Sequence, residues 1–507
     1  MLQASVIQIR LVSDAVKITR PMDLMSELLK RHQTLFQNAA LVVLGLVTLW
    51  QSVAFDFVNW DDVSYVQQND LIRSWSPANL WGIATETVTR NYAPLTILSF
   101  LIDHTIWGNI PSGYHATNVL LHLLNGVLVF LLLKQLTGNL FIAWLTAALF
   151  LVHPVQIESV VWISSRKGLL CSAFMLWAAI VRLRPEVTAR QDAWYFGLLI
   201  AALLSKALAI VFPPIVLLYD VLIRREKMAP AIARQVIPGL LTLLLLFYTA
   251  GVQNTVLGGV RGHMGFSLLH IMAIDVTILW QYVAMLFCPT ELCVLYDPPT
   301  SGIGMKVLVG SVAWAAVGYA FWRVRKSQPL SILGALSFLL LLFPVLNFFR
   351  ITTLMNDRYL YLPCIVFFAM AASIVQRIVT FAESESGRLG QIIGNSLRGM
   401  VVVVSLAACL TLTLQHLPVW QNSQTLWTHA IQQYPKLTVL RIQMALTVHA
   451  QGQEREAIRQ LQLALLECQP DDQDRERMGG MTDEWQAQIT ARQEIATSGK
   501  RQNDSSN

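Results

Sequence analysis

Charged side chains that could carry out group transfer gather in four short stretches of an otherwise apolar sequence. The first stretch, FVNWDDVSYV at 57–66, contains two adjacent carboxylates, Asp61 and Asp62. A carboxylate beside a bound hydroxyl can remove its proton as a general base. The other stretches combine carboxylates with Arg and Lys, in HPVQIESVVWISSRKG at 153–168, LLSK at 203–206 and FPVLNFFRITTLMNDRYLYLP at 343–363.

Carboxylates opposite a basic cluster suit one kind of reaction particularly well. Arg and Lys hold a phosphate or diphosphate group and neutralise its charge as it leaves. A carboxylate then activates the incoming hydroxyl. Glycosyl transfer from a lipid-phosphate sugar needs both parts, whereas transport of an anionic substrate needs only the cations. A transporter or flippase therefore remains the alternative.

The elements that must position these groups are membrane helices. Of the 507 residues, 54% are hydrophobic and only 13% are charged, against about 25% charged in an ordinary globular protein. Roughly ten stretches approach the 18–20 apolar residues of a transmembrane helix. The runs are continuous and not alternating, which favours helices over a β-barrel. The composition excludes a soluble enzyme, and no basic stripe interleaved with aromatic residues suggests a nucleic-acid partner.

The distribution of basic residues predicts the topology. Residues 1–38 are basic and the loop at 56–113 is acidic, so the positive-inside rule places the N-terminus in the cytoplasm and this loop outside. We expect the segment 266–288 to stay at the outer surface without crossing. The prediction is an all-α membrane domain at 39–420 with eleven spans, at 39–55, 114–133, 140–157, 168–184, 193–205, 207–223, 231–251, 305–322, 330–346, 359–377 and 397–416.

The composition changes after Trp420. Residues 421–470 predict amphipathic helices, and Ala430 and Ala464 are separated by the 34-residue period of tetratricopeptide repeats. One and a half repeats are too few for a free solenoid, so we expect them to pack on the membrane domain or on a protein partner. Residues 471–507 predict a polar, partly disordered tail.

The ordered set of motifs resembles a known family. FVNWDD, NYAPLTILSFLIDHTIWG, GYHATNVLLHLLN, LFLVHPVQIESVVWISSRKGLL, LLSK, NDRYLYLP and VWQNSQTLWTHAI occur in this order. Together they are similar to the transmembrane-and-tetratricopeptide-repeat protein O-mannosyltransferases, which are GT-C glycosyltransferases. The resemblance implies an active site outside the membrane, a polyprenyl-phosphate-linked sugar donor such as a mannose carrier, and no metal or other cofactor.

The resemblance also implies a role for each candidate residue. The catalytic acid of such enzymes lies in the first outer loop, which indicates Asp61 or Asp62, with a slight preference for Asp62; helix capping is the ordinary alternative for this pair. Arg358 is the best single phosphate ligand. The other expected phosphate ligands are Arg166, Lys167 and Lys206, with Glu158, Asp357 and Tyr359 in support. Ala207 departs from the family pattern after the SK motif, which puts the local role of Lys206 in doubt.

One predicted helix carries His and Asn residues that could suggest a metal site. His115 and His122 share a helix face with Asn118 and Asn125, which favours polar packing between helices over a metal site.

A scaffold displaying the C-terminal helices is a third hypothesis for the whole chain. The acceptor is a protein, glycan or lipid, and membrane lipids surround the protein. The short repeat region favours a bacterial inner membrane, with the site and the C-terminus facing the periplasm.

Overall fold

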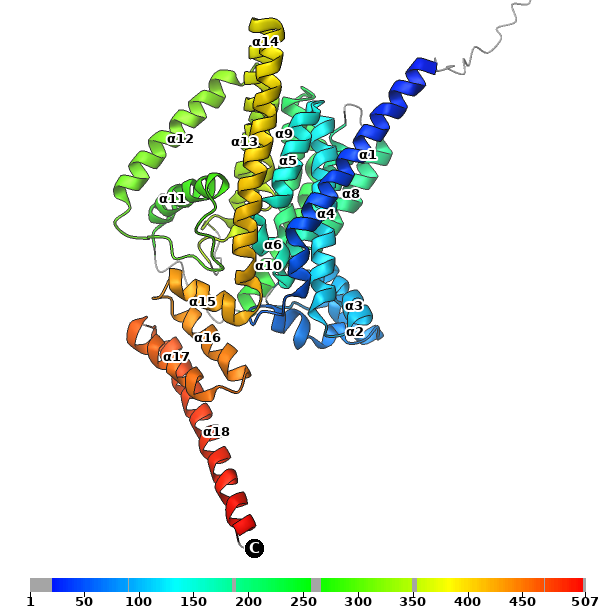
Figure 1. The fold of residues 1–507 in the computed structure, drawn as a ribbon. Helices are drawn as coiled ribbons and strands as arrows, with labels where there is room; N and C mark the ends of the chain where they lie inside the picture. Colours follow the sequence, from blue (N-terminus) through cyan, green and yellow to red (C-terminus); the bar gives the residue numbers. More distant parts are fainter. Residues whose placement is uncertain are drawn as a thin grey trace, which may run out of the picture.

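The computed structural model describes residues 21–89, 91–184, 188–256, 266–348, 353–468 and 470–504. Figure 1 shows a bundle of helices, with α2, α3 and the C-terminal helices gathered at one end. The first nine helices are α1 (Pro21–Leu49), α2 (Pro77–Thr85), α3 (Pro94–Trp107), α4 (Pro111–Thr137), α5 (Leu140–Val152), α6 (Ile157–Val161), α7 (Arg166–Arg182), α8 (Ala189–Leu203) and α9 (Phe212–Leu222). The others are α10 (Met228–Val256), α11 (Leu268–Phe287), α12 (Gly304–Val324), α13 (Pro329–Leu342), α14 (Pro363–His416), α15 (Ser423–Gln433), α16 (Thr438–Ala450), α17 (Glu454–Glu467) and α18 (Asp472–Asp504).

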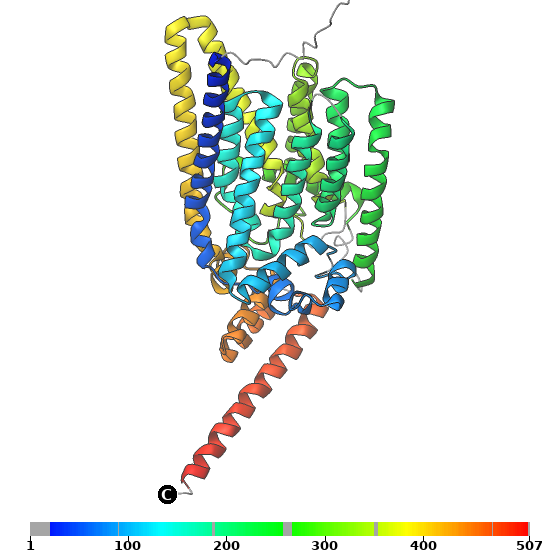
Figure 2. The same ribbon diagram turned by 90° about the vertical axis from the view of Figure 1, so that its right-hand side faces the viewer.

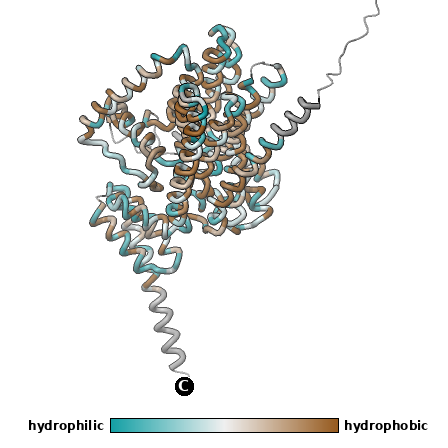
Figure 3. Tube along the Cα trace, turned by 45° about the horizontal axis from the view of Figure 1, so that its top comes forward, coloured by the Kyte–Doolittle hydropathy of each residue, from teal (hydrophilic) through white to brown (hydrophobic). Residues whose placement is uncertain are grey.

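Apolar helices dominate the bundle, and no β-strand occurs in the described residues. Seven described helices are long and apolar enough to cross a membrane, or eight if α5 and the bent segment after it form one span. Figure 3 shows hydrophobic residues along the bundle and hydrophilic residues in the C-terminal helices. The chain is therefore an all-helical, multi-pass membrane protein, as predicted. The figure of eleven spans stays a prediction, because α8, α9 and α13 are shorter than the roughly 20 residues of a full span.

The predicted spans 359–377 and 397–416 form one helical hairpin within α14. Gly387 turns the chain with a φ of +53°, which is a conformation that glycine adopts without strain. A β-carbon at Gly390 would lie 2.1 Å from the carbonyl oxygen of Ala382, so the two arms meet at glycine. Figure 2 shows this hairpin, in yellow, extending beyond the end of the bundle.

The segment 266–288 forms α11. Its length and composition would allow it to cross a membrane. Figure 1 nevertheless shows α11 lying across the long direction of the bundle, whereas α13 and α14 follow that direction. That this segment stays at the outer surface without crossing remains a prediction.

Polar contacts between helices explain the His and Asn residues on α4. The ring of His122 lies 2.9 Å from the Tyr361 hydroxyl, and the Asn125 amide donates to the same hydroxyl at 3.0 Å. The Asn118 amide donates to the carbonyl oxygens of Val160 and Trp162. These contacts join α4 to segments far away in the sequence, as expected for polar packing between membrane helices.

The region after Trp420 consists of the four helices α15 to α18. Ala430 and Ala464, on α15 and α17, are both fully buried, although the assignment of these helices to a tetratricopeptide repeat stays a prediction. The polar, partly disordered tail predicted at 471–507 stays a prediction, and within it the structure forms α18 from Asp472 to Asp504. Its Trp485 is buried and stacks on His449 with ring centroids 4.2 Å apart, which the polar composition did not indicate.

Candidate active site

A sharp bend after α5 places the first candidate groups. The helix ends at Val152, and α6 follows Pro154 at an angle of 58°, since proline cannot continue a helix ladder. The segment from His153 through α6 to Arg166 is buried throughout. It carries Glu158 into the interior and begins α7 at the end of the bundle where the first loop lies.

Glu158 pairs with Arg358, 200 residues later. The Arg358 guanidinium donates to Glu158 Oε1, and the Arg358 backbone N–H donates to Oε2 at 2.8 Å. The guanidinium lies 5.1 Å from the Trp162 ring and 5.3 Å from the Tyr359 ring. Arg358 is thus fixed by a bidentate contact with one carboxylate and by two aromatic faces.

Lys167 lies near the same tryptophan and pairs with Asp61. The Lys167 ammonium lies 3.8 Å from Asp61 Oδ2 and 5.9 Å from the Trp162 ring. It also donates to the Tyr65 hydroxyl at 3.3 Å. The Asp61 side chain is 31% exposed, which leaves its carboxylate open to a substrate.

Lys206 approaches this group from the linker between α8 and α9. Its ammonium lies 3.7 Å from the position that a β-carbon would take at Gly168, directly after Lys167. It is within electrostatic reach of Lys167, Arg358 and Glu158. Among the described residues, the Lys206 ammonium has no hydrogen bond or ion pair, although Lys206 is partly buried. An unpaired cation in such surroundings is costly unless an anion joins it.

Asp357 completes the cluster on its far side. The Tyr296 hydroxyl donates to Asp357 Oδ1 and accepts the Cys293 backbone N–H at 2.9 Å. Burial and then the negative charge of Glu158 raise the pKa of Asp357 well above its usual range. The cluster thus brings three basic side chains, Lys167, Lys206 and Arg358, together with the carboxyl groups of Asp61, Glu158 and Asp357.

Two predicted residues are instead engaged in the protein interior. Arg166 is completely buried, and its three side-chain nitrogens donate to Asp103, to Asn118 at 2.8 Å and to the Tyr114 carbonyl oxygen at 2.8 Å. The structure therefore does not bring Arg166 into the cluster. The reason is that the first turn of α7 directs Arg166 toward α3 and α4, while Lys167 lies on another face.

Asp62 is also enclosed. Its Oδ2 accepts the Val58 N–H at 3.1 Å, while Oδ1 accepts both the backbone N–H, at 3.0 Å, and the hydroxyl of Ser164. Burial is the main cause that raises the pKa of Asp62 to about 6. These contacts connect the first loop to the bend before α7, so the geometry favours Asp61 over Asp62 as the group facing a substrate.

The sequence reasoning missed Trp162, Tyr296 and Asp103. Trp162 belongs to the motif at 153–168, but nothing in the sequence indicated that two cations would lie near its ring. Asp103 is a lone acid in an apolar helix, which is a recognisable sign of a buried partner. Tyr296 belongs to a stretch without periodicity, and only the tertiary structure brings it to Asp357.

The first loop is also bound to the C-terminal helices. Asn59 donates its backbone N–H to the Ser423 hydroxyl at 2.8 Å and its amide N–H to the Gln443 carbonyl oxygen at 3.0 Å. The Trp427 indole donates to Asn59 Oδ1 and its ring packs edge-on against Trp60, 5.4 Å away. Asn59 and Trp60 immediately precede Asp61, so α15 and α16 help to place the candidate base.

Comparison with known proteins gives matches in sequence, although no family model matches the chain. Protein O-mannosyl-transferase F38B6.6 of Caenorhabditis elegans is 26% identical over 373 residues, which are 69% of this chain and 52% of that protein. Mouse TMTC1 is 36% identical over 137 residues, covering 25% of this chain and 14% of that protein. Human TMTC4 is 32% identical over 161 residues, covering 27% and 22%. The chain thus spans about half the length of the nematode relative, and less of the others.

Two solved structures have a limited likeness to the fold. An oligosaccharyltransferase of Archaeoglobus fulgidus has a TM-score of 0.46 at 13% identity, with 78% of this chain and 56% of that chain covered. ArnT of Cupriavidus metallidurans has a TM-score of 0.41 at 11% identity, with 82% and 80% covered. It is the sequence matches that confirm the predicted resemblance of this chain to the transmembrane-and-tetratricopeptide-repeat protein O-mannosyltransferases.

Proposed function

We propose that this protein is a membrane glycosyltransferase that moves a sugar from a polyprenyl-phosphate donor to an acceptor hydroxyl. The observation that carries the proposal is the Lys206 ammonium, which is unpaired among the described residues and within electrostatic reach of Lys167 and Arg358, together with the partly open carboxylate of Asp61 next to Lys167. A donor phosphate supplies the anion that this group of cations lacks. The names of the relatives support mannose as the sugar and a protein as the acceptor.

In the proposed reaction, Asp61 removes the proton from the acceptor hydroxyl. The acceptor oxygen forms a bond to the anomeric carbon of the sugar, and the bond from that carbon to the phosphate oxygen breaks. The polyprenyl phosphate leaves with the electron pair, and its added charge is stabilised by Arg358, Lys206 and Lys167. The reaction as proposed needs no metal, because three side-chain cations take the position that an ion would otherwise fill.

The remaining residues position this group. Glu158 and the rings of Trp162 and Tyr359 hold Arg358, while the Tyr296 contact holds Asp357. Asp62 keeps the loop in place through Ser164. We place the site on the outer face of the membrane by the positive-inside rule, which means the periplasm if the source is bacterial.

The direct test uses the full chain in membranes, with a radiolabelled polyprenyl-phosphate mannose and a hydroxyl-bearing peptide. We expect label in the peptide from the wild-type protein and from a conservative Lys134→Arg control. Asp61→Asn and Lys206→Gln should remove it while insertion is unchanged. Transfer at the wild-type rate in both variants would overturn the proposal. Label that crosses proteoliposomes without any covalent product would favour the transporter instead.

A further inference from the structure

A cavity of about 390 Å³ lies among α4, α7, α9, α13 and the first arm of α14, and the proposed reaction does not use it. Its walls are mostly apolar, with Leu132, Met175 and Leu341 among the lining residues. Along α14 the lining extends from Leu362 to Arg377, which is about 22 Å at 1.5 Å of rise per residue. A long apolar cavity within membrane helices suits a hydrocarbon chain better than a compact polar molecule.

The polar residues of the lining gather at the end of the bundle opposite the candidate active site. Thr137 ends α4, whose first residue directly follows the first loop, and Gln328 precedes α13. The 27-residue α4 is about 40 Å long, so Thr137 lies far from the first loop. This end of the cavity is its mouth. Arg377 is exposed there, and one guanidinium N–H of Arg377 donates to Gln328 Oε1. No other contact of that guanidinium occurs in the described part of the chain.

The rim of the mouth is basic and aromatic. Arg325 and Lys326 are exposed just before Gln328, and the Arg325 guanidinium lies 4.1 Å from the Trp322 ring. Trp322 and Tyr319 are large exposed aromatics at the end of α12. Tryptophan and tyrosine gather where a membrane meets water, so the mouth lies at the depth of lipid head groups.

We propose that this cavity binds one chain of an anionic phospholipid, whose phosphate is held at the mouth by Arg377. The cationic rim complements the head group, and the apolar walls take the chain. Basic pockets between membrane helices on the cytoplasmic side bind anionic head groups in this way. The positive-inside rule assigns this end to the cytoplasm, so the head-group contact lies at the opposite end of the bundle from the proposed sugar-donor phosphate.

The cavity itself is tested by filling it. The full chain, purified in mild detergent, is incubated with phosphatidylglycerol and phosphatidylcholine, and the retained lipid is measured by mass spectrometry. Ser337 is buried and lines the cavity, whereas its neighbour Leu336 is exposed on the same helix. We expect Ser337→Trp to lower phosphatidylglycerol retention at least about tenfold. The indole would occupy the cavity, so the hydrocarbon chain of the lipid would lose its contact with the apolar walls. Leu336→Trp is the matched control and should retain lipid as the wild type does.

The head-group contact is tested by charge. Arg377→Gln should lower the preference for phosphatidylglycerol over phosphatidylcholine about fivefold, as expected for one basic residue near an anionic head group. Arg388→Gln, an exposed position on α14 outside the cavity lining, is the control. Equal retention in Ser337→Trp and Leu336→Trp, or no preference for the anionic lipid in the wild type, would overturn the proposal. Because retained lipid is the readout, the result is independent of any sugar transfer.

Discussion

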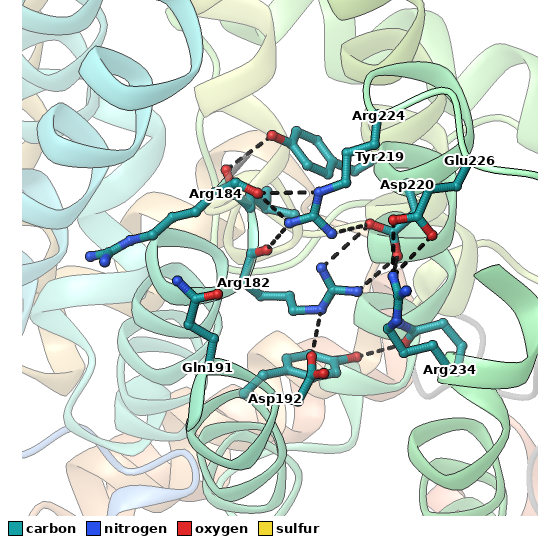
Figure 4. A network of polar contacts seen from close by, with 12 residues as sticks. Arg182, Arg184, Gln191, Asp192, Tyr219, Asp220, Arg224, Glu226 and Arg234 are labelled. Carbon is teal, nitrogen blue, oxygen red and sulfur yellow. Dashed lines mark hydrogen bonds and ion pairs between the residues drawn. The ribbon is translucent and has the colours of Figure 1, made fainter. Parts of the chain in front are cut away.

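Two clusters of acidic and basic residues lie at opposite ends of α7, and they differ in how completely their charges are paired. Figure 4 shows the first, around Asp220 of α9. Asp220 is fully buried and pairs with Arg182 at 2.8 Å, with Arg224 and, at 3.6 Å, with Arg234. Arg182 also reaches Asp192 at 3.3 Å, and Arg234 pairs with Glu226 at 3.0 Å. Each of the three arginines around Asp220 therefore has a carboxylate partner.

The second cluster lies at the start of α7, about 22 Å away by the helix rise from Lys167 to Arg182. It also contains carboxylates and cations, but Lys206 has no partner among the described residues and Asp61 is partly open. Residue type alone therefore does not distinguish a structural charge cluster from a functional one in this protein. A cluster with complete pairing holds helices together, whereas incomplete pairing at an open carboxylate indicates a site for a substrate.

The largest effect should come from the candidate base. Asp61→Asn keeps the size of the side chain but removes the proton acceptor, so we expect transfer to fall about 10²- to 10⁴-fold. Melting of the purified protein should be unchanged, because Asp61 is partly exposed. A loss of activity in Asp62→Asn with full activity in Asp61→Asn would reverse the assignment.

The paired cluster should respond in stability. Asp220→Asn leaves Arg224 without its buried counter-charge and leaves Arg182 with only the partly exposed Asp192, and breaking a buried pair in this way typically costs about 3–5 kcal/mol. We expect a large drop in the denaturation midpoint of the detergent-solubilised protein. The control is Glu226→Gln, since the partly exposed Arg234 is the one ion-pair partner of Glu226 among the described residues. Equal midpoints in the two variants would show that the pairing around Asp220 does not have this stabilising role.

The unpaired cation should respond in the opposite way. Lys206→Gln removes a charge that has no ion-pair partner among the described residues, so we expect equal or higher thermal stability and about 10²-fold slower transfer. The expected activity change is in kcat, because the charge acts mainly on the departing phosphate. A marked fall in stability without a change in kcat would assign Lys206 to structure.

The contact of the first loop with α15 and α16 should have a smaller effect. Asn59→Ala removes the side-chain hydrogen bonds to Gln443 and Trp427, and we expect roughly a tenfold lower kcat from the misplaced Asp61. Asn59→Asp keeps the acceptor for the Trp427 indole and should restore part of the rate. The control Asn109→Ala removes an exposed contact with Arg73 in the same loop. If both alanine variants behave alike, α15 and α16 do not position the base.

The smallest effect concerns pH. Burial raises the pKa of Asp62 to about 6, above its value in the unfolded chain. The folded form therefore binds this proton more tightly, so its contribution to stability is complete at low pH and is lost as the pH rises through about 6. We expect the melting temperature to fall mainly between about pH 4 and pH 6, the interval between the unfolded and folded pKa values, and to fall less in Asp62→Asn. An identical slope in both proteins would show that Asp62 is not the responsible group.

The sequence alone determined the class of the protein and most of the candidate residues. Continuous apolar runs predict helices because only hydrogen-bonded helices or barrels satisfy the backbone in lipid. The scarcity of charge then made Asp61, Lys167, Lys206 and Arg358 conspicuous, and the structure places all four near one another. The resemblance was equally readable, because it depends on the order of motifs and not on their contacts.

Only the tertiary structure decided which of neighbouring residues faces the site. Asp61 and Asp62 are adjacent in sequence, as are Arg166 and Lys167, yet Asp62 and Arg166 are enclosed by interior hydrogen bonds whereas Asp61 and Lys167 contact each other and stay partly exposed. Neighbouring side chains point in different directions on a helix or turn, and their partners come from segments up to 200 residues away. The helical tail and the position of Tyr296 depend on such distant contacts as well, which local sequence patterns do not contain.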